Sequence, residues 1–229
     1  MMNLELTPKA VLVNLLYFLI FLFLCNIGAL FCQFYFGHDT IYGLVPLFKF
    51  NDENNIPTLY SSIALLFSAA LLFSIAINNK KSGDSYLYWL WLAVIFIFLS
   101  IDETASIHER FKDPTRELLN AKGLFYFAWV IPYGLAVTLF LIFYIRFLII
   151  LPRITMILFV VSGFIYVLGA IGLEMVSGMY AELHGTNTSI YETIATFEEL
   201  FEMLGVIVFI YALLSHIKSK HQGLVISVK

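Results

Sequence analysis

The sequence predicts an all-α fold, a polytopic transmembrane bundle of six helices that forms a single domain over residues 1–229. Two features of the composition support this prediction: 61% of the 229 residues are hydrophobic, and only 13% are charged. A soluble domain carries about 45–50% apolar and about 25% charged residues. Long uncharged stretches also recur along the chain, as membrane-spanning helices require. Together these features exclude a soluble globular domain, a disordered chain and a nucleic-acid-binding protein.

Each predicted span follows from a stretch without Asp, Glu, Lys, Arg or His, because a helix needs about 20 apolar residues to cross the hydrocarbon core. Five such stretches approach or exceed this length: 10–37, 54–79, 85–101, 123–145 and 154–173. The last stretch, 203–215, is too short to cross alone, so the sixth helix must include the acidic residues before it. The predicted spans are therefore about 10–35, 58–78, 86–103, 124–146, 154–181 and 190–217.

Several residues inside these spans have an expected structural role. The first span exceeds a signal-peptide core of about 7–15 residues, so we interpret it as a retained helix. Cys25 and Cys32 lie within it and in no loop, which favours small core residues over a disulfide. Pro132 and Gly134 are expected to kink or break the fourth span. Four glycines allow close helix packing on the fifth span: Gly163, Gly169, Gly172 and Gly178.

The loop charges predict an orientation. Eight of the 13 Lys and Arg residues flank the side of the bundle that carries both termini. By the positive-inside rule this side is cytoplasmic, and we expect a multi-pass protein of the cell inner membrane. Fourteen of the 16 acidic residues fall on the opposite, extracytoplasmic side or in the outer ends of helices. Acidic residues contribute little to topology, so this segregation needs another explanation.

The acidic residues are concentrated at three helix ends. Asp102 and Glu109 share a face if the third helix continues past the membrane, whereas His108 joins them only if the chain bends. Glu198 and Glu202 lie four residues apart on the sixth helix, where like charges repel unless a cation or a proton lies between them. Glu202 would lie about 9 Å inside the hydrocarbon. Ionisable side chains at such a depth face a bundle interior or a wet cavity.

This pattern predicts one acidic, metal-binding pocket at the extracytoplasmic face. The candidate metal ligands are Asp102, Glu103, His108, Glu174 and Glu202. The candidate catalytic carboxylates are Glu109, Glu198 and Glu199, and Glu182 and His184 are secondary candidates. Carboxylate oxygens favour Ca²⁺, Mg²⁺ or Mn²⁺, whereas His108 would bring in Zn²⁺ or iron, so the identity of the divalent metal ion stays open.

The neighbouring polar residues have simpler interpretations. Ser189 and Glu192 have the spacing of a capping box at the start of the sixth helix. Asp113 and Pro114 are expected to begin a short surface helix that stops at Gly123. Four cations form a solvated face or neutralise nearby acids: Arg110, Lys112, Arg116 and Lys122. The segment 37–56 is either a lid over the pocket or an interfacial loop.

Three functional hypotheses use the same residues. The first is a metal-dependent hydrolase or lipid-modifying enzyme, in which metal-bound water attacks a lipid or another apolar substrate. The second is a proton- or cation-coupled transporter, although no acid lies near the inner half of any predicted span. The third is a non-catalytic membrane subunit or ligand-binding module whose acids bind a cation or a cationic partner. Membrane lipid is an expected partner in each case.

Four segments carry a resemblance to a known group of proteins: Ile56–Ser62, Asp102–Glu109, Phe127–Pro132 and Phe197–Gly205. Taken together and in order, they resemble an uncharacterised family of small bacterial polytopic membrane proteins. The resemblance implies a six-helix inner-membrane protein, and it implies no activity.

Overall fold

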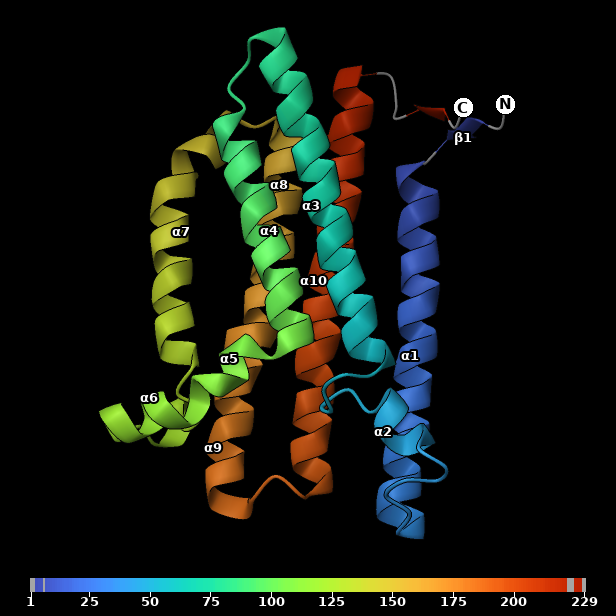
Figure 1. Cartoon of the computed structure of the whole chain (residues 1–229), viewed down its shortest axis with the longest axis vertical. Coiled ribbons are helices and arrows are strands. Elements are labelled where there is room, and N and C mark those ends of the chain that lie inside the picture. Colours follow the sequence, from blue (N-terminus) through green and yellow to red (C-terminus); the bar gives the residue numbers. More distant parts are fainter. Residues whose placement is uncertain (1–2, 6, 222–224, 228–229) are drawn as a thin grey trace.

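The fold is a bundle of membrane-spanning helices, as the composition predicts. The computed structural model describes residues 3–5, 7–221 and 225–227. Among these residues, six helical segments are long and apolar enough to cross a membrane. They are α1 (Pro8–Phe36), α3 (Ile56–Ser82), α4 (Leu87–Ala105), α7 (Val130–Ile150), the continuous segment Arg153–His184, and α10 (Ser189–His221). The all-α, six-span prediction is therefore confirmed (Figure 1).

The remaining elements are short. The loops carry α2 (Leu44–Phe48), α5 (Ile107–Arg110), α6 (Lys112–Leu119) and the 3₁₀ turn η1 (Gly123–Phe125). The segment Arg153–His184 consists of α8 (Arg153–Val167), the π-helical turn η2 (Leu168–Leu173) and α9 (Glu174–His184). The strands β1 (Asn3–Glu5) and β2 (Val225–Ser227) pair antiparallel, which joins the two ends of the chain. Both termini therefore lie at one end of the bundle (Figure 1).

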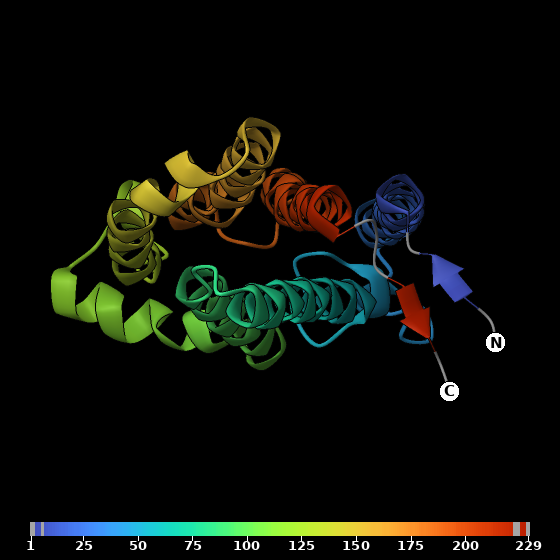
Figure 2. The same cartoon turned by 90° about the horizontal axis from the view of Figure 1, so that it is seen from above.

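Helix α10 lies at the centre of the packing. It contacts α1, α3, α8, η2 and α9, while α4 packs mainly against α3. Viewed from above, α7 and α1 stand at opposite edges of the molecule (Figure 2). The main core gathers around α10, with Ile210, Leu213 and Leu72 fully or almost fully buried. The central position of α10 explains why its acidic segment faces protein on several sides.

The fourth span begins later than predicted. Helix α7 starts at Val130 rather than near residue 124, because Gly123–Phe125 forms the turn η1 instead. Pro132 lies in the first turn of α7, where its missing N–H would have had no helical partner. The expected kink at Pro132 and Gly134 is therefore wrong: the proline stands at the beginning of the helix.

Two predicted helix starts are also wrong in detail. Helix α6 spans Lys112–Leu119, and the carboxylate of Asp113 pairs with Arg116 at 2.6 Å instead of capping the helix. At the start of α10 the Thr188 hydroxyl accepts the Tyr191 N–H at 3.2 Å, so Thr188 provides the cap that the capping box assigned to Ser189. Glu192 is buried and pairs with Lys49 at 3.0 Å.

The segment 37–56 is tied down by polar contacts. The Asn26 side chain bonds Thr196 of α10 and accepts the Phe50 N–H at 2.9 Å. Asn55 caps α3 by accepting the Thr58 N–H at 3.0 Å and donates to the Lys49 carbonyl at 2.6 Å. These buried bonds connect α1, the loop and α10. Cys25 and Cys32 are free cysteines on α1, as predicted, but they lie half-buried rather than in the core.

Candidate functional site

A sharp bend after α4 brings His108 to Asp102. Ser106 adopts a left-handed backbone with φ of 49°, so α4 ends there and α5 continues in a different direction. The backbone N–H of His108 donates to Asp102 Oδ1 at 2.8 Å, and the ring atom His108 Nδ1 lies 3.4 Å from Asp102 Oδ2. Tyr133 of α7 donates its hydroxyl to the same carboxylate at 3.2 Å. The bend that the sequence required for His108 to join Asp102 is present.

His108 is a charged partner of this carboxylate. Burial lowers the pKa of His108, but the hydrogen bond and charge of Asp102, with Glu109, outweigh that effect and raise the pKa to about 9. The imidazole is therefore protonated at neutral pH and forms an ion pair with Asp102. Its ring also lies 4.7 Å from the Trp129 ring, which links α5 to the start of α7.

The π-helical turn η2 brings the fifth span against α10. A Cβ atom added at Gly169 would lie 2.7 Å from the Glu198 carbonyl oxygen, so only glycine permits this approach. Gly178 is similarly close to Phe127, as expected for packing glycines. Gly163 faces open space and Gly172 meets only Leu168 of its own helix, so the packing role predicted for these two is wrong. π-Helical turns often occur at functional sites.

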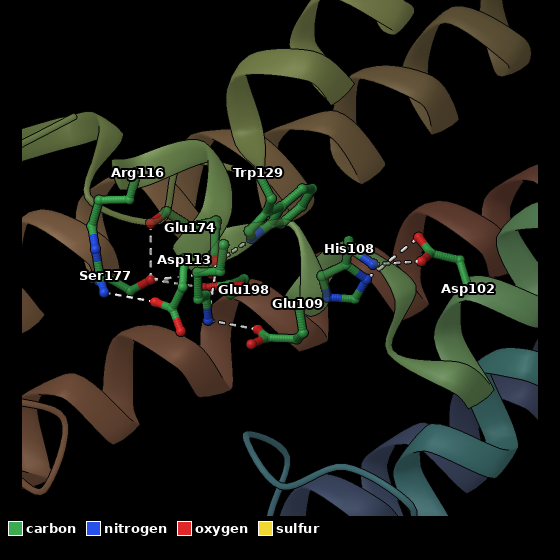
Figure 3. A network of polar contacts seen from close by, with 10 residues as sticks. Asp102, His108, Glu109, Asp113, Arg116, Trp129, Glu174, Ser177 and Glu198 are labelled. Atoms are coloured by element: carbon green, nitrogen blue, oxygen red, sulfur yellow. Dashed lines mark hydrogen bonds and ion pairs between the residues drawn. The ribbon is translucent and has the colours of Figure 1, made fainter. Parts of the chain in front are cut away.

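Glu174 and Glu198 face each other across this contact (Figure 3). Trp129 Nε1 donates to Glu174 Oε1 at 2.7 Å. The Ser177 hydroxyl lies 3.0 Å from the Glu174 backbone carbonyl, 3.4 Å from Glu174 Oε2 and 3.1 Å from Glu198 Oε2. The two carboxyl groups are also within hydrogen-bonding contact of each other. Two acids from different helices are therefore joined by one serine and by their own contact.

Lys112 contributes an ammonium group to this region. Its Nζ lies 2.6 Å from Glu109 Oε1 and 4.0 Å from Glu174 Oε1. The same Nζ lies 3.8 Å from the centroid of the Phe127 ring, a cation–π contact. Of the four cations that the sequence placed near the acids, Lys112 is thus a neutralising residue. Arg116 instead pairs with Asp113 on the surface helix α6.

The other three predicted acids form the inner part of the site. Glu103, Glu199 and Glu202 are half-buried and lie within electrostatic range of one another. Glu202 also lies within electrostatic range of His108 and of Glu174. Asp102, Glu174 and Glu202 therefore belong to the same interior region of the bundle. We call the complete set the acidic cluster: Glu53, Asp102, Glu103, Glu109, Glu174, Glu198, Glu199 and Glu202.

Sequence reasoning missed several members of the site. Glu53 lies in the loop before α3, within electrostatic range of Glu103 and Glu109, and no spacing rule connects it to them. The Ser61 hydroxyl is buried, faces Glu103 and forms no hydrogen bond of good geometry with the described residues. Trp129 and Ser177 donate to the central carboxylates. Trp129 belongs to a segment that carried the family resemblance, which was the one available signal.

The secondary candidates lie apart from the cluster. Glu182 is exposed and accepts the Gly123 N–H at 2.6 Å, so it fixes the turn η1. His184 is exposed at the end of α9 and stacks on Tyr180 at 4.4 Å. Both contacts are structural. Glu192, which pairs with Lys49, belongs to the contacts that hold the loop before α3.

The acidic cluster is not a ready-made metal centre. Within the described parts of the chain, no group of three or more His, Cys, Asp or Glu side chains is arranged to hold a metal ion. Asp102 is bonded by His108 and Tyr133, and Glu174 is bonded by Trp129 and Ser177. These donors occupy oxygens that a metal would need.

Six apolar helices and an acidic cluster, whose members except the exposed Glu53 are buried or half-buried, define a multi-pass membrane protein with a polar interior site. The chain belongs to the family defined by a domain of unknown function, DUF8692, whose family model matches residues 14–217. No curated protein and no solved structure shows significant similarity to it. The match includes the acidic cluster and confirms the expectation of an uncharacterised family.

Proposed function

We propose that the protein binds cations in the acidic cluster, at the extracytoplasmic face of a cell inner membrane, with both termini in the cytoplasm. One observation carries this proposal: the balance of charge in the cluster. The cluster has eight carboxyl groups. Among the described residues, two cationic side chains form ion pairs with them, His108 and Lys112. Seven of the eight carboxyl groups, all except that of the exposed Glu53, belong to buried or half-buried residues. Buried charges without partners are costly, so further positive charge has to enter the cluster.

Protons supply this charge in the resting state. Glu174 and Glu198 are in hydrogen-bonding contact, and two ionised carboxylates repel each other at such a separation. One proton shared between them removes the repulsion and provides the hydrogen for the bond. Ser177 has one hydroxyl hydrogen, and the Glu174 backbone carbonyl at 3.0 Å competes for it with the two carboxylates, so the serine cannot satisfy both of them. The arrangement thus supports a proton held between α9 and α10.

A divalent metal ion is the ligand that replaces these protons. Glu103, Glu199 and Glu202, together with the Ser61 hydroxyl, offer oxygen atoms, which Mg²⁺, Ca²⁺ and Mn²⁺ prefer. His108 is turned towards Asp102, which favours an all-oxygen ligand set over a zinc or iron site. Since the side chains are not arranged as a finished centre, binding requires side-chain rotation and the release of protons. The affinity should therefore fall as the pH falls.

Manganese binding tests the proposal. Purified protein in detergent is titrated with Mn²⁺, the free ion is followed by electron paramagnetic resonance, and proton release is followed by calorimetry in buffers of different ionisation enthalpy. Glu202→Gln should weaken binding about tenfold or more. Glu117→Gln is the matched control, because Glu117 is an exposed acid of α6. Absence of binding by the wild-type protein, or equal binding by Glu202→Gln, would refute the proposal.

Hydrolysis of a lipid or another apolar substrate is the second candidate function. A surface hollow of about 460 Å³ is lined by Glu109 together with Asn54, Thr104, Ala105, Ser106 and Arg110. The polar group of an amphiphile in the membrane could reach Glu109 there. Lipid extracts incubated with the protein in liposomes should then show a product by mass spectrometry that is lost in Glu109→Gln. An identical lipid profile with wild-type protein, the variant and empty liposomes excludes this activity for the lipids supplied.

A further inference from the structure

Lys112 occupies the outer entrance of the acidic cluster. Its ammonium contacts Glu109 at 2.6 Å and Glu174 at 4.0 Å, and its side chain is 18% exposed. Glu109 belongs to the rim, whereas Glu174 is buried and contacts Glu198 deeper inside. Lys112 therefore bridges the rim and the interior, and it holds a positive charge where a cation entering the cluster first meets buried carboxylates.

The helix that carries Lys112 lies at the periphery. Helix α6 follows the bend at Ser106 and the short α5, and it projects sideways from the bundle (Figures 1 and 2). Leu118 near its end is 81% exposed. Its contacts with the bundle include the cation–π pairs Lys112–Phe127 and Arg116–Tyr126. Side-chain contacts of this kind can be exchanged without unfolding a spanning helix, so the ammonium of Lys112 can leave while the bundle stays intact.

The rim of the cluster is accessible from outside beside Glu109, in a hollow that Lys112 itself does not line. Glu109 lines the surface hollow and is also the closest partner of Lys112. A cation that enters the hollow meets a carboxylate that is already neutralised. Because two cations close to one carboxylate repel each other, the incoming ion and the Lys112 ammonium compete for Glu109 and then for Glu174.

We infer that Lys112 is a tethered counter-cation that closes the outer entrance of the acidic cluster and is displaced when a divalent cation binds. This inference rests on the proposed function, because it assigns the regulation of the same site. In the empty state Lys112 stabilises the rim acids. In the loaded state its ammonium moves into the headgroup region or water, and Glu109 becomes available to the ion or to a substrate.

Mn²⁺ titration of charge variants tests this inference in the full-length protein. Lys112→Met keeps an apolar stem for Phe127 and removes the charge, so the dissociation constant for Mn²⁺ should fall about tenfold. Lys122→Met is the matched control, because it removes the same charge from an exposed position nearby and should leave the affinity unchanged. Lys112→Arg keeps the charge and should stay close to wild type. Size-exclusion profiles establish that each variant is folded.

A measurement on the wild-type protein complements the variants. Amine-reactive labelling of Lys112, quantified by peptide mass spectrometry, should accelerate several-fold when Mn²⁺ is added, while labelling of Lys122 should not change. Wild-type binding without tighter binding by Lys112→Met, or without faster labelling of Lys112, overturns the inference and leaves the proposed function standing. Absence of Mn²⁺ binding by both the wild type and Lys112→Met overturns the two together.

Discussion

The two ends of α10 show how one helix can serve opposite purposes. Near the chain termini its residues Phe209, Ile210 and Leu213 join a dry core of aromatic and aliphatic side chains. Two turns or more towards the start of α10, Glu198, Glu199 and Glu202 lie among carboxyl groups from α4 and α9. Both segments are covered by neighbouring helices. Packing around a central helix therefore does not by itself make an apolar core.

The dry half separates the acidic cluster from the opposite end of the bundle. The rings of Phe159 and Phe209 lie 4.8 Å apart, and the rings of Trp89 and Phe159 lie 6.0 Å apart. The buried hydroxyls of Ser68 and Ser162 donate to carbonyls of their own helices at 2.9 Å, so they do not form a relay between helices. This arrangement favours a one-sided site over transport, and we expect no cation flux in liposomes.

The largest expected effect on stability lies in the polar half. Burial lowers the pKa of Lys49, but the hydrogen bonds and charges of Glu192 and Asp52 raise it overall, so Lys49 stays charged. Lys49→Met leaves Glu192 buried without its partner and should cost about 3–5 kcal/mol of unfolding free energy. The double variant Lys49→Met/Glu192→Leu should recover most of this loss, as measured by thermal unfolding in detergent. A double variant as unstable as the single one would contradict the ion-pair explanation.

A cavity in the dry half should cost slightly less and leave the site intact. Leu213 is fully buried, so Leu213→Ala should destabilise the protein by about 2–5 kcal/mol. Leu141→Ala on the exposed face of α7 is the matched control and should have little effect. In both variants Mn²⁺ binding per folded molecule should remain at the wild-type level. Loss of binding in folded Leu213→Ala protein would show that the two halves are coupled.

The ion pair between His108 and Asp102 should make stability depend on pH. The pKa of His108 is raised to about 9 from an ordinary value near 6.5, mainly through Asp102, which outweighs the opposing effect of burial. Because the pKa is raised in the folded state, the protonated His108 stabilises that state. This contribution is fully present below about pH 6.5 and is lost as the pH rises through about 9. The upper limit of this contribution to the free energy of unfolding is about 3 kcal/mol.

Two measurements check this window. The melting temperature should fall between pH 7 and pH 10 in the wild type, and much less in Asp102→Asn. The NMR titration of the His108 ring should move from near 9 to near 6.5 in that variant. A wild-type His108 that titrates near 6.5 would contradict the ion pair.

The smallest expected effect is on the surface helix. Arg116 pairs with Asp113 at 2.6 Å across one turn of α6, and the Asp113 side chain is 71% exposed. Exposed pairs of this spacing contribute about 0.3–0.5 kcal/mol because water and salt screen them. Arg116→Met should therefore change the melting temperature by at most a degree or two, and Mn²⁺ affinity should stay at the wild-type level. A large loss of stability would mean that α6 supports the bundle more than its contacts indicate.

Much of the acidic cluster was predictable from the sequence, because a bilayer penalises charge strongly. The position of Glu202 inside an otherwise apolar span and the acids after residue 101 indicated a buried acidic site. Glu53 and Lys49 could not be placed in the same way. Each depends on contacts between distant parts of the chain, such as Lys49 with Glu192, and no local pattern encodes such a pair.

Local backbone conformation was equally hidden. Ser106 carries no sequence signal for a left-handed backbone, yet this residue decides whether His108 meets Asp102. No local pattern signals the π-helical turn η2, which places Gly169 against the Glu198 carbonyl of α10. The lengths of the uncharged stretches therefore predicted the spanning helices, and packing decided the local departures from them.

By itself, the sequence determined that this protein spans a membrane six times and that its acids gather at one end, because transfer of charge into hydrocarbon is costly at any position. The tertiary structure alone decided which acids touch, which are neutralised by His108 and Lys112, and which remain without a cation. That decision depends on contacts between different helices, such as Lys112 with Glu174 at 4.0 Å, and on the local bend that brings His108 within 3.4 Å of Asp102. Hydrophobicity along a single chain carries no information about either.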